Sequence, residues 1–140
     1  NYDDYYYNKR SRAKLFPGTR KLIKQISKKN ILSIASSGKK DNIENLLKQN
    51  GLKNSFDLIL ADFSHSKERM LKKILTRSGV RPENTIMVTD TVGDINVAKK
   101  VGLKTIAVTW GFHSKQLLLK ACPDYIANNF NHLAKAIDKL

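Results

Sequence analysis

Apolar and polar positions follow one another along the chain in segments that predict strands and helices in turn. The short apolar runs are bounded by turn residues and predict strands. Between them, apolar residues recur at helical spacing, which predicts helices with one buried face. Strands are expected at 31–36, 56–61, 85–89, 104–109 and 125–127, and helices around Leu22–Ile26, Ile43–Leu47, Met70–Leu75, Ile95–Val101, Leu117–Leu119 and Leu133–Leu140. Repeated strand–helix units with apolar strands predict an α/β fold built on a parallel, helix-covered sheet.

Several expected helix ends carry specific residues. Asp41, with Glu44 three residues later, matches a capping box and predicts a helix start at Asp41. Ser66 precedes an apolar-periodic stretch and is a candidate N-cap. Gly51 and Gly79 follow two of the helical stretches and predict where those helices stop.

Length and composition predict one globular domain. The 140 residues include 41% hydrophobic and 27% charged residues, which is ordinary for such a domain. No apolar run approaches membrane-spanning length, and the tyrosine-rich start does not resemble a signal peptide. Cys122 is the only cysteine, which excludes an internal disulfide and is typical of a reducing, intracellular setting. We therefore expect a cytoplasmic protein with no membrane partner.

The formal net charge of +14 has two interpretations. It could attract nucleic acid or an anionic substrate. Alternatively, it reflects a solvated surface rich in lysine, and the distribution of the lysines favours this interpretation. They occur one or two per predicted helix, on faces away from the apolar stripe, and the one basic tract is 8–14. Nucleic-acid binding stays open as the less favoured alternative.

The segment Val88–Asp94 carries two carboxylates directly after an apolar run. Asp90 is expected at the carboxyl end of a buried strand, and Asp94 near the start of the next helix. Ligands of open α/β sheets bind at that edge, and two carboxylate oxygens there suit Mg²⁺. The alternative for Asp94 is that it only caps the helix.

Other polar residues are expected at the same edge. Ser36 and Ser37 end one predicted strand, Asp62 follows another, and Lys67 stands near a helix start. Hydroxyls and backbone N–H groups at a strand-to-helix turn can hold phosphate oxygens, and a lysine neutralises phosphate charge. With the two aspartates, this set makes the electrostatic half of a phosphoryl-transfer site. Taken singly, the serines could begin a loop and Lys67 could be a solvated helix residue.

These residues resemble the motifs of a known family. Ile34–Ser37, Lys67 and Val88–Gly102 look like the second, third and fourth motifs of the haloacid dehalogenase-like hydrolases, and more closely those of the phosphoglycolate phosphatase-like branch. The segments 16–19, 105–112 and 123–126 are also similar to that branch. The resemblance covers residues 16–140 and implies a Rossmann-like core with a three-layer arrangement around a parallel sheet.

The resemblance also implies roles for the site residues. Ser36, together with Ser37, would bind the transferred phosphoryl group, and Lys67 would act as a catalytic residue that steadies this group and the nucleophile. Asp90 and Asp94 would hold Mg²⁺, directly or through water. Thr89 stands where many relatives have glycine.

The family's first motif is missing. That motif is an Asp-x-Asp at the end of an N-terminal strand, and its first aspartate attacks phosphorus. No Asp-x-Asp occurs in the 140 residues, and Asp3-Asp4 are adjacent with no apolar strand before them. The resemblance therefore implies a tail or remnant of a helical cap at 1–15, and a core lacking its first strand at 16–140. We expect the sheet to be completed by self-association, by 1–14 or another N-terminal segment, or by direct pairing of the flanking strands.

The sequence thus predicts a Mg²⁺-dependent phosphomonoester hydrolase, or its C-terminal part, with a small phosphorylated substrate. Catalysis would pass through an aspartyl-phosphate whose nucleophile is not in this chain, so the chain alone is expected to be inactive. The alternative is a non-catalytic phosphate- or nucleic-acid-binding or assembly module on the same core. Trp110 could line the substrate entrance beside Phe112 and His113, or simply pack under a loop. His65 and His132 are expected to be surface residues.

Overall fold

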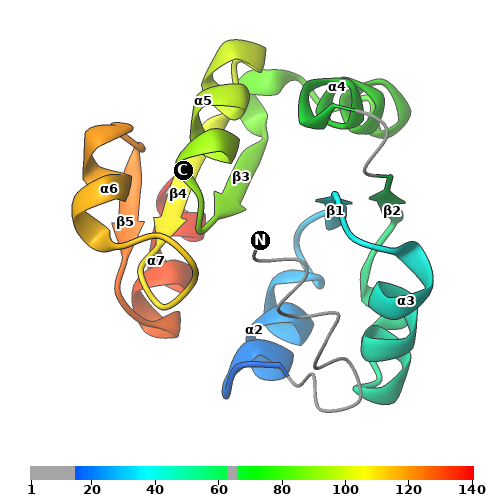
Figure 1. The fold of residues 1–140 in the computed structure, drawn as a ribbon. Helices are drawn as coiled ribbons and strands as arrows, with labels where there is room; N and C mark the ends of the chain where they lie inside the picture. The colour runs from blue at the N-terminus through cyan, green and yellow to red at the C-terminus, as the bar shows by residue number, and fades with distance from the viewer. Residues whose placement is uncertain (1–14, 63–65) are drawn as a thin grey trace. The chain divides into compact units, whose positions relative to one another are not determined.

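The computed structural model of the chain describes residues 15–62 and 66–140 (Figure 1). The expected tail or cap remnant falls outside this range except for Leu15, and so does His65. The chain divides into two compact units, one up to Met70 and one from Leu71 onward. Each unit is described by itself.

The first unit contains a two-stranded parallel sheet with its crossover helix. Its elements are α2 (Thr19–Ile26), β1 (Ser33–Ser36), α3 (Lys40–Gln49), the 3₁₀ turn η2 (Lys53–Ser55), β2 (Leu58–Ala61) and the first turn of α4 (Lys67–Ser78). Strand β1 pairs with β2 so that Ser33 lies opposite Leu58 and Ser36 opposite Ala61. Every residue of both strands is only half-buried.

The second unit contains a three-stranded parallel sheet in the order β3-β4-β5. After the rest of α4 come the 3₁₀ turn η3 (Pro82–Asn84), β3 (Ile86–Thr89), α5 (Val92–Val101), β4 (Lys104–Val108), α6 (Lys115–Lys120), β5 (Tyr125–Ala127) and α7 (Phe130–Lys139). Helix α5 contacts β3 and β4, and α7 contacts β4 and β5. The predicted parallel α/β fold is therefore confirmed.

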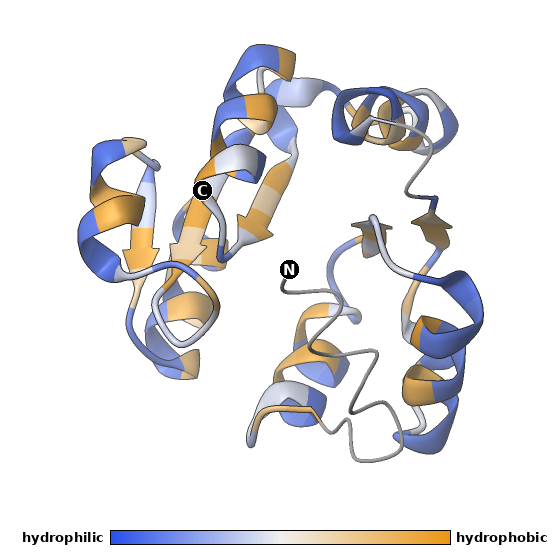
Figure 2. Cartoon of the chain, in the orientation of Figure 1, coloured by the Kyte–Doolittle hydropathy of each residue, from blue (hydrophilic) through white to orange (hydrophobic). Residues whose placement is uncertain are grey.

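The core of the second unit centres on β4. Ile95 of α5, Ala107 of β4 and Leu118 of α6 form one fully buried cluster. Because strand side chains alternate between faces, Ile106 lies on the face of β4 opposite to Ala107, and it too is fully buried. Figure 2 shows the same pattern, with mostly hydrophobic strands and helices that carry hydrophobic and hydrophilic residues on different sides.

Strands β1 and β3 differ from β4 in their pairing. Strand β4 has a strand on each side, whereas β1 pairs only with β2, and β3 pairs only with β4, among the strands that the structure describes. The strands β1 and β3 belong to different sheets. Completion of the sheet by self-association or by an N-terminal segment stays a prediction.

Two of the expected helix starts have different outcomes. Ser66 caps α4 as predicted, since the Arg69 N–H donates to Ser66 Oγ at 3.2 Å. The capping box at Asp41 is wrong, because α3 begins at Lys40 and its N-cap is Lys39, with no side-chain cap bond. The backbone is still extended at Lys39 and is already helical at Asp41, so this carboxylate lies in the first turn, where it complements the helix dipole.

Within the residues that the structure describes, no helix has the length and apolarity needed to cross a membrane.

Candidate functional site

The end of β1 forms a tight turn around Ser36. The Gly38 N–H donates to Ser36 Oγ at 3.0 Å, which folds the chain back toward α3. The Asp62 N–H donates to the Ser36 carbonyl oxygen at 3.1 Å and extends the pairing of β1 with β2 by one residue. Ser36 is half-buried and Ser37 is exposed. The serines thus lie at the carboxyl end of the strand, as the sequence predicts.

Lys67 lies against this strand end. Its Nζ donates a hydrogen bond to the Ala35 carbonyl oxygen at 2.9 Å, across 32 positions of sequence. Lys67 is the first residue of α4 and is half-buried. The ammonium group is therefore placed beside the residue that precedes Ser36, and the alternative of a fully solvated helix lysine is wrong.

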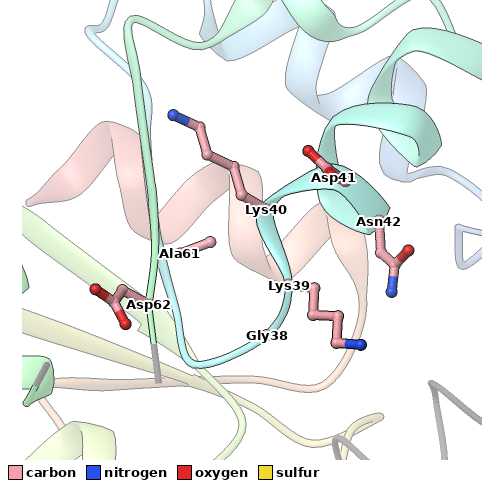
Figure 3. Close-up of a pocket in the computed structure, with 7 residues that line it drawn as sticks. All are labelled: Gly38, Lys39, Lys40, Asp41, Asn42, Ala61 and Asp62. Atoms are coloured by element: carbon pink, nitrogen blue, oxygen red, sulfur yellow. The ribbon is translucent and has the colours of Figure 1, made fainter. Parts of the chain in front are cut away.

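A shallow, open pocket lies beside these residues. It has a volume of about 390 Å³ and is lined by Gly38, Lys39, Lys40, Asp41, Asn42, Ala61 and Asp62. Figure 3 shows the turn into α3 on one side of it and the end of β2 on the other. The lining combines the N-terminus of a ten-residue helix and two lysines with two carboxylates, Asp41 and Asp62, so its formal side-chain charges balance. Ser36 and Lys67 are not among the lining residues, so this pocket adjoins the predicted phosphate site and does not coincide with it.

In the second unit, Asp94 is held at the end of β3 by a buried threonine. Thr89 is 6% exposed, and its Oγ1 donates to Asp94 Oδ2 at 2.8 Å. The hydroxyl oxygen of Thr89, Oγ1, also accepts the Thr91 N–H at 3.2 Å. The cap of α5 is Thr91, whose side chain accepts the Asp94 N–H at 3.3 Å. The interpretation of Asp94 as the helix cap is therefore wrong, and its carboxylate has a different partner.

Asp90 is held by the loop that follows β4. The Phe112 N–H donates to Asp90 Oδ2 at 2.9 Å, and the His113 N–H donates to the Asp90 carbonyl oxygen at 3.1 Å. A Cβ atom on Gly111 would overlap the Asp90 carboxylate, so only glycine fits at this close approach. The carboxylates of Asp90 and Asp94 thus share one strand end, and each has a defined hydrogen-bond donor.

These two carboxylates fit a partly hydrated Mg²⁺ ion. Mg²⁺ takes oxygen ligands and is usually bound by one or two carboxylates, with waters and phosphate oxygens completing its shell. In the described parts of the chain, no group of three or more His, Cys, Asp or Glu side chains could hold a metal ion. A Mg²⁺ ion held by these two carboxylates would therefore need water and phosphate oxygens to complete its shell.

Trp110 packs against Phe130, the first residue of α7. Its ring lies 4.7 Å from that of Phe130, at an interplanar angle of 42°. Phe112 is exposed and stacks on His113, with 4.9 Å between ring centroids. This contact supports the packing interpretation of Trp110, and a place at the substrate entrance stays a prediction. His132 is exposed, as expected.

The structure brings the predicted site residues together in two groups. Within the first unit, Ser36, Asp62 and Lys67 meet at the end of β1. Within the second, Asp90 and Asp94 share the end of β3. The convergence of the two groups on one site stays a prediction.

Sequence reasoning missed the contribution of Gly111 and of the His113 ring. A signal was present, because Gly-Phe-His follows an apolar strand and so was expected at the same sheet edge as the aspartates. The pattern did not show that a glycine was needed there.

Comparisons with known proteins agree with this geometry. The family model described as haloacid dehalogenase-like hydrolase matches residues 1–108. The chain is 37% identical over 128 residues to a phosphoglycolate phosphatase of Synechococcus elongatus. The aligned residues cover 90% of this chain and 60% of the relative. The chain is 28% identical over 113 residues to a pyrophosphatase of Bacillus mycoides, covering 78% of this chain and 53% of that relative.

Solved structures show the same fold. A haloacid dehalogenase-like hydrolase from Streptococcus pneumoniae matches with a TM-score of 0.83 and 27% identity, covering 95% of this chain and 65% of that one. A predicted phosphatase from Clostridium acetobutylicum matches with a TM-score of 0.87 and 26% identity, covering 98% and 66%. The chain thus spans between about half and two thirds of the length of these relatives.

Proposed function

The chain belongs to the haloacid dehalogenase-like hydrolase family, and we propose that it supplies the phosphate-binding and magnesium-binding residues of a phosphatase. The substrate is a small phosphomonoester. Support comes from relatives named as a phosphoglycolate phosphatase and a pyrophosphatase, both of which act on phosphorylated or phosphate compounds by name. We include a cytoplasmic location in the proposal, on the basis of the single cysteine.

Each group of residues has a defined task in this proposal. The hydroxyls of Ser36 and Ser37 donate to oxygens of the transferred phosphoryl group, and the Lys67 ammonium balances its negative charge. Asp90 and Asp94 hold Mg²⁺. When bound, the ion neutralises charge on the phosphoryl oxygens and orients the group.

The nucleophile is not among these residues. An aspartyl-phosphate route needs a carboxylate aimed at phosphorus and a second group that protonates the leaving oxygen. The family's Asp-x-Asp supplies both, and this sequence contains none. We therefore expect the 140-residue chain to bind metal and phosphate without turnover.

The observation that carries the proposal is the pair of held carboxylates at the end of β3. Thr89 fixes Asp94, and the Phe112 N–H fixes Asp90. Donors that hold the ligands before the ion binds reduce the cost of ordering them. Lys67 beside Ser36 supports the phosphate half independently.

The experiment has two arms, binding and turnover. Mn²⁺, used as a paramagnetic probe for Mg²⁺, is titrated into the chain, and we expect selective broadening of amide signals around Asp90 and Asp94. Asp90→Asn should abolish this broadening, whereas Asp138→Asn, an exposed control in α7, should retain it. Broadening that survives Asp90→Asn would contradict the metal assignment.

For turnover, p-nitrophenyl phosphate hydrolysis is measured with and without Mg²⁺. If the reading frame that encodes this chain also encodes an upstream Asp-x-Asp, the longer product is compared with the chain. We expect Mg²⁺-dependent hydrolysis by the product that carries an Asp-x-Asp, lost in Asp90→Asn. Metal binding without hydrolysis by either protein would instead favour the non-catalytic module.

A further inference from the structure

We propose that the loop Gly111–His113 is the positioning element for Asp90, and that the His113 ring is its principal positioning residue. The inference rests on the proposed role of Asp90 as a magnesium ligand. It assigns a task to a histidine that none of the family motifs quoted above includes. All of the contacts involved lie within the second unit.

His113 joins both sides of the turn that carries Asp90. Its backbone N–H donates to the Asp90 carbonyl oxygen at 3.1 Å. Its ring Nδ1 accepts the Val92 N–H at 2.9 Å, across 21 positions of sequence. Val92 is the first residue of α5, where a backbone N–H has no partner inside the helix. The imidazole satisfies that N–H and thereby fastens the start of α5 to the loop after β4.

The direction of this hydrogen bond fixes the form of the ring. A backbone N–H can only donate, so Nδ1 must accept, and the ring proton of the bonded form is on Nε2. The Phe112 ring stacks on the same imidazole, with 4.9 Å between ring centroids. The ring orientation of His113 is therefore defined by a hydrogen bond and by an aromatic neighbour.

The rest of the loop acts on the Asp90 carboxylate itself. The Phe112 N–H engages Oδ2 at 2.9 Å, so Oδ1 is the oxygen that we expect to reach the cation. Gly111 leaves the space that the carboxylate occupies. Because its φ is not in the left-handed region, the requirement for glycine here is steric and not conformational. A residue with a Cβ would push Asp90 away from its observed position.

These contacts place His113 among the groups that orient a metal ligand without touching the metal. Loss of such a group typically weakens metal binding by about 10- to 100-fold. Removal of the ring would free the Val92 N–H at the start of α5, whereas the backbone bond from His113 to the Asp90 carbonyl oxygen would remain. We infer that the ring acts on Asp90 through the start of α5, without bonding the carboxylate itself.

The test measures Mn²⁺ binding to the 140-residue chain by amide broadening, together with thermal unfolding. His113→Ala should raise the Mn²⁺ dissociation constant at least about tenfold. His113→Asn should restore most of the affinity, because its side-chain oxygen can accept the Val92 N–H. His132→Ala, which removes an exposed histidine from α7, should bind as the unchanged chain does.

Gly111→Ala gives a second route that does not depend on the ring. It should weaken Mn²⁺ binding more than His113→Ala does. Asn131→Ala, at an exposed position of α7 away from the loop, is the control and should bind Mn²⁺ as the unchanged chain does.

The outcomes separate this inference from the proposed function. If the unchanged chain shows no Mn²⁺ binding at Asp90 and Asp94, the proposed function fails and the inference fails with it. If the unchanged chain binds Mn²⁺ and folded His113→Ala binds it equally well, only the inference is overturned. Failure of His113→Asn to recover affinity would also overturn it, since the effect would then not come from the lost acceptor.

Discussion

Two threonines are buried among the described residues, and each donates its hydroxyl to an aspartate. Thr89 at the end of β3 donates to Asp94 Oδ2 at 2.8 Å, and Thr105 in β4 donates to Asp124 Oδ2 at 3.1 Å. Each hydroxyl also accepts one backbone N–H, from Thr91 in the first case and from Asp124 in the second. The chemistry of the two pairs is therefore the same.

The pairs differ in how far apart their partners lie in the sequence. Thr89 bonds residues two and five positions away, within one strand-to-helix turn. Thr105 bonds Asp124 across 19 positions, and its own N–H adds a second bond to that carboxylate at 2.7 Å. The Thr105 pair therefore ties the segment before β5 to β4, whereas the Thr89 pair only shapes a turn.

The two strands also differ in burial. Four of the five residues of β4 are buried, whereas Thr89 is the only buried residue of β3 and Val88 is 42% exposed. The cause is pairing, because β4 has a strand on both sides and β3 has one described partner. The difference indicates that β4 supplies most of the buried strand core of this unit, while the end of β3 presents the carboxylates that we propose as metal ligands.

The largest expected effect tests the difference in burial. Ile106→Ala, in the middle of β4, should lower the free energy of unfolding by about 2–5 kcal/mol. Val88→Ala, on β3, should lower it by about 1 kcal/mol or less, because that side chain is already partly in solvent. Urea unfolding of both variants measures the difference. Equal losses would break the comparison and indicate that the exposed face of Val88 is covered in solution.

The next effect tests the long-range pair. Thr105→Val keeps the shape of the side chain but removes the partner of the Asp124 N–H and one donor to its carboxylate. We expect a loss of about 1–3 kcal/mol in the free energy of unfolding, with unchanged Mn²⁺ affinity. Urea unfolding and Mn²⁺ titration on the same sample measure both quantities. A weakened Mn²⁺ affinity would show that the bonds of Thr105 in β4 also affect metal binding by Asp90 and Asp94.

For the pair of Thr89 and Asp94 we expect the opposite result: a clear loss of Mn²⁺ affinity and a smaller loss of stability. Thr89→Val removes the hydroxyl that holds Asp94, and it should raise the Mn²⁺ dissociation constant about tenfold. It should reduce stability less than Thr105→Val does, because its bonds are local. Thr76→Val is the matched control, since Thr76 is exposed in α4 and its hydroxyl bonds only the Lys72 carbonyl oxygen within the same helix. Unchanged Mn²⁺ affinity in Thr89→Val would contradict a positioning role for the hydroxyl.

The smallest expected effect tests whether α7, which packs on β4 and β5, contributes to stability without affecting metal binding. Asn129 caps α7, and its side chain accepts the His132 N–H at 2.8 Å. Asn129→Ala should cost about 1 kcal/mol of stability and leave Mn²⁺ binding as it is. Thermal unfolding and Mn²⁺ titration provide the two measurements. A change in metal affinity would mean that α7 acts on the site through the sheet.

The sequence by itself determined the order of strands and helices, the parallel α/β class and the residues at the strand ends. It did so because strand and helix periodicities are local properties of the chain. It also placed Asp90 and Asp94 in one strand-to-helix turn, and the Thr89 bond to Asp94 belongs to that turn. The errors were local as well, since the start of α3 and the cap of α5 each depended on the backbone conformation of one residue.

Only the tertiary structure decided which distant groups hold these residues. The bond from Lys67 to the end of β1 spans 32 positions, and the bond from Phe112 to Asp90 spans 22. Such pairs meet because parallel strands bring their carboxyl ends to one edge after a helical crossover, and the turn that follows sets the final approach. Gly111 shows most clearly what could not be predicted from the sequence. Its lack of a side chain is visible in the sequence, but the carboxylate that needs the space comes from another strand.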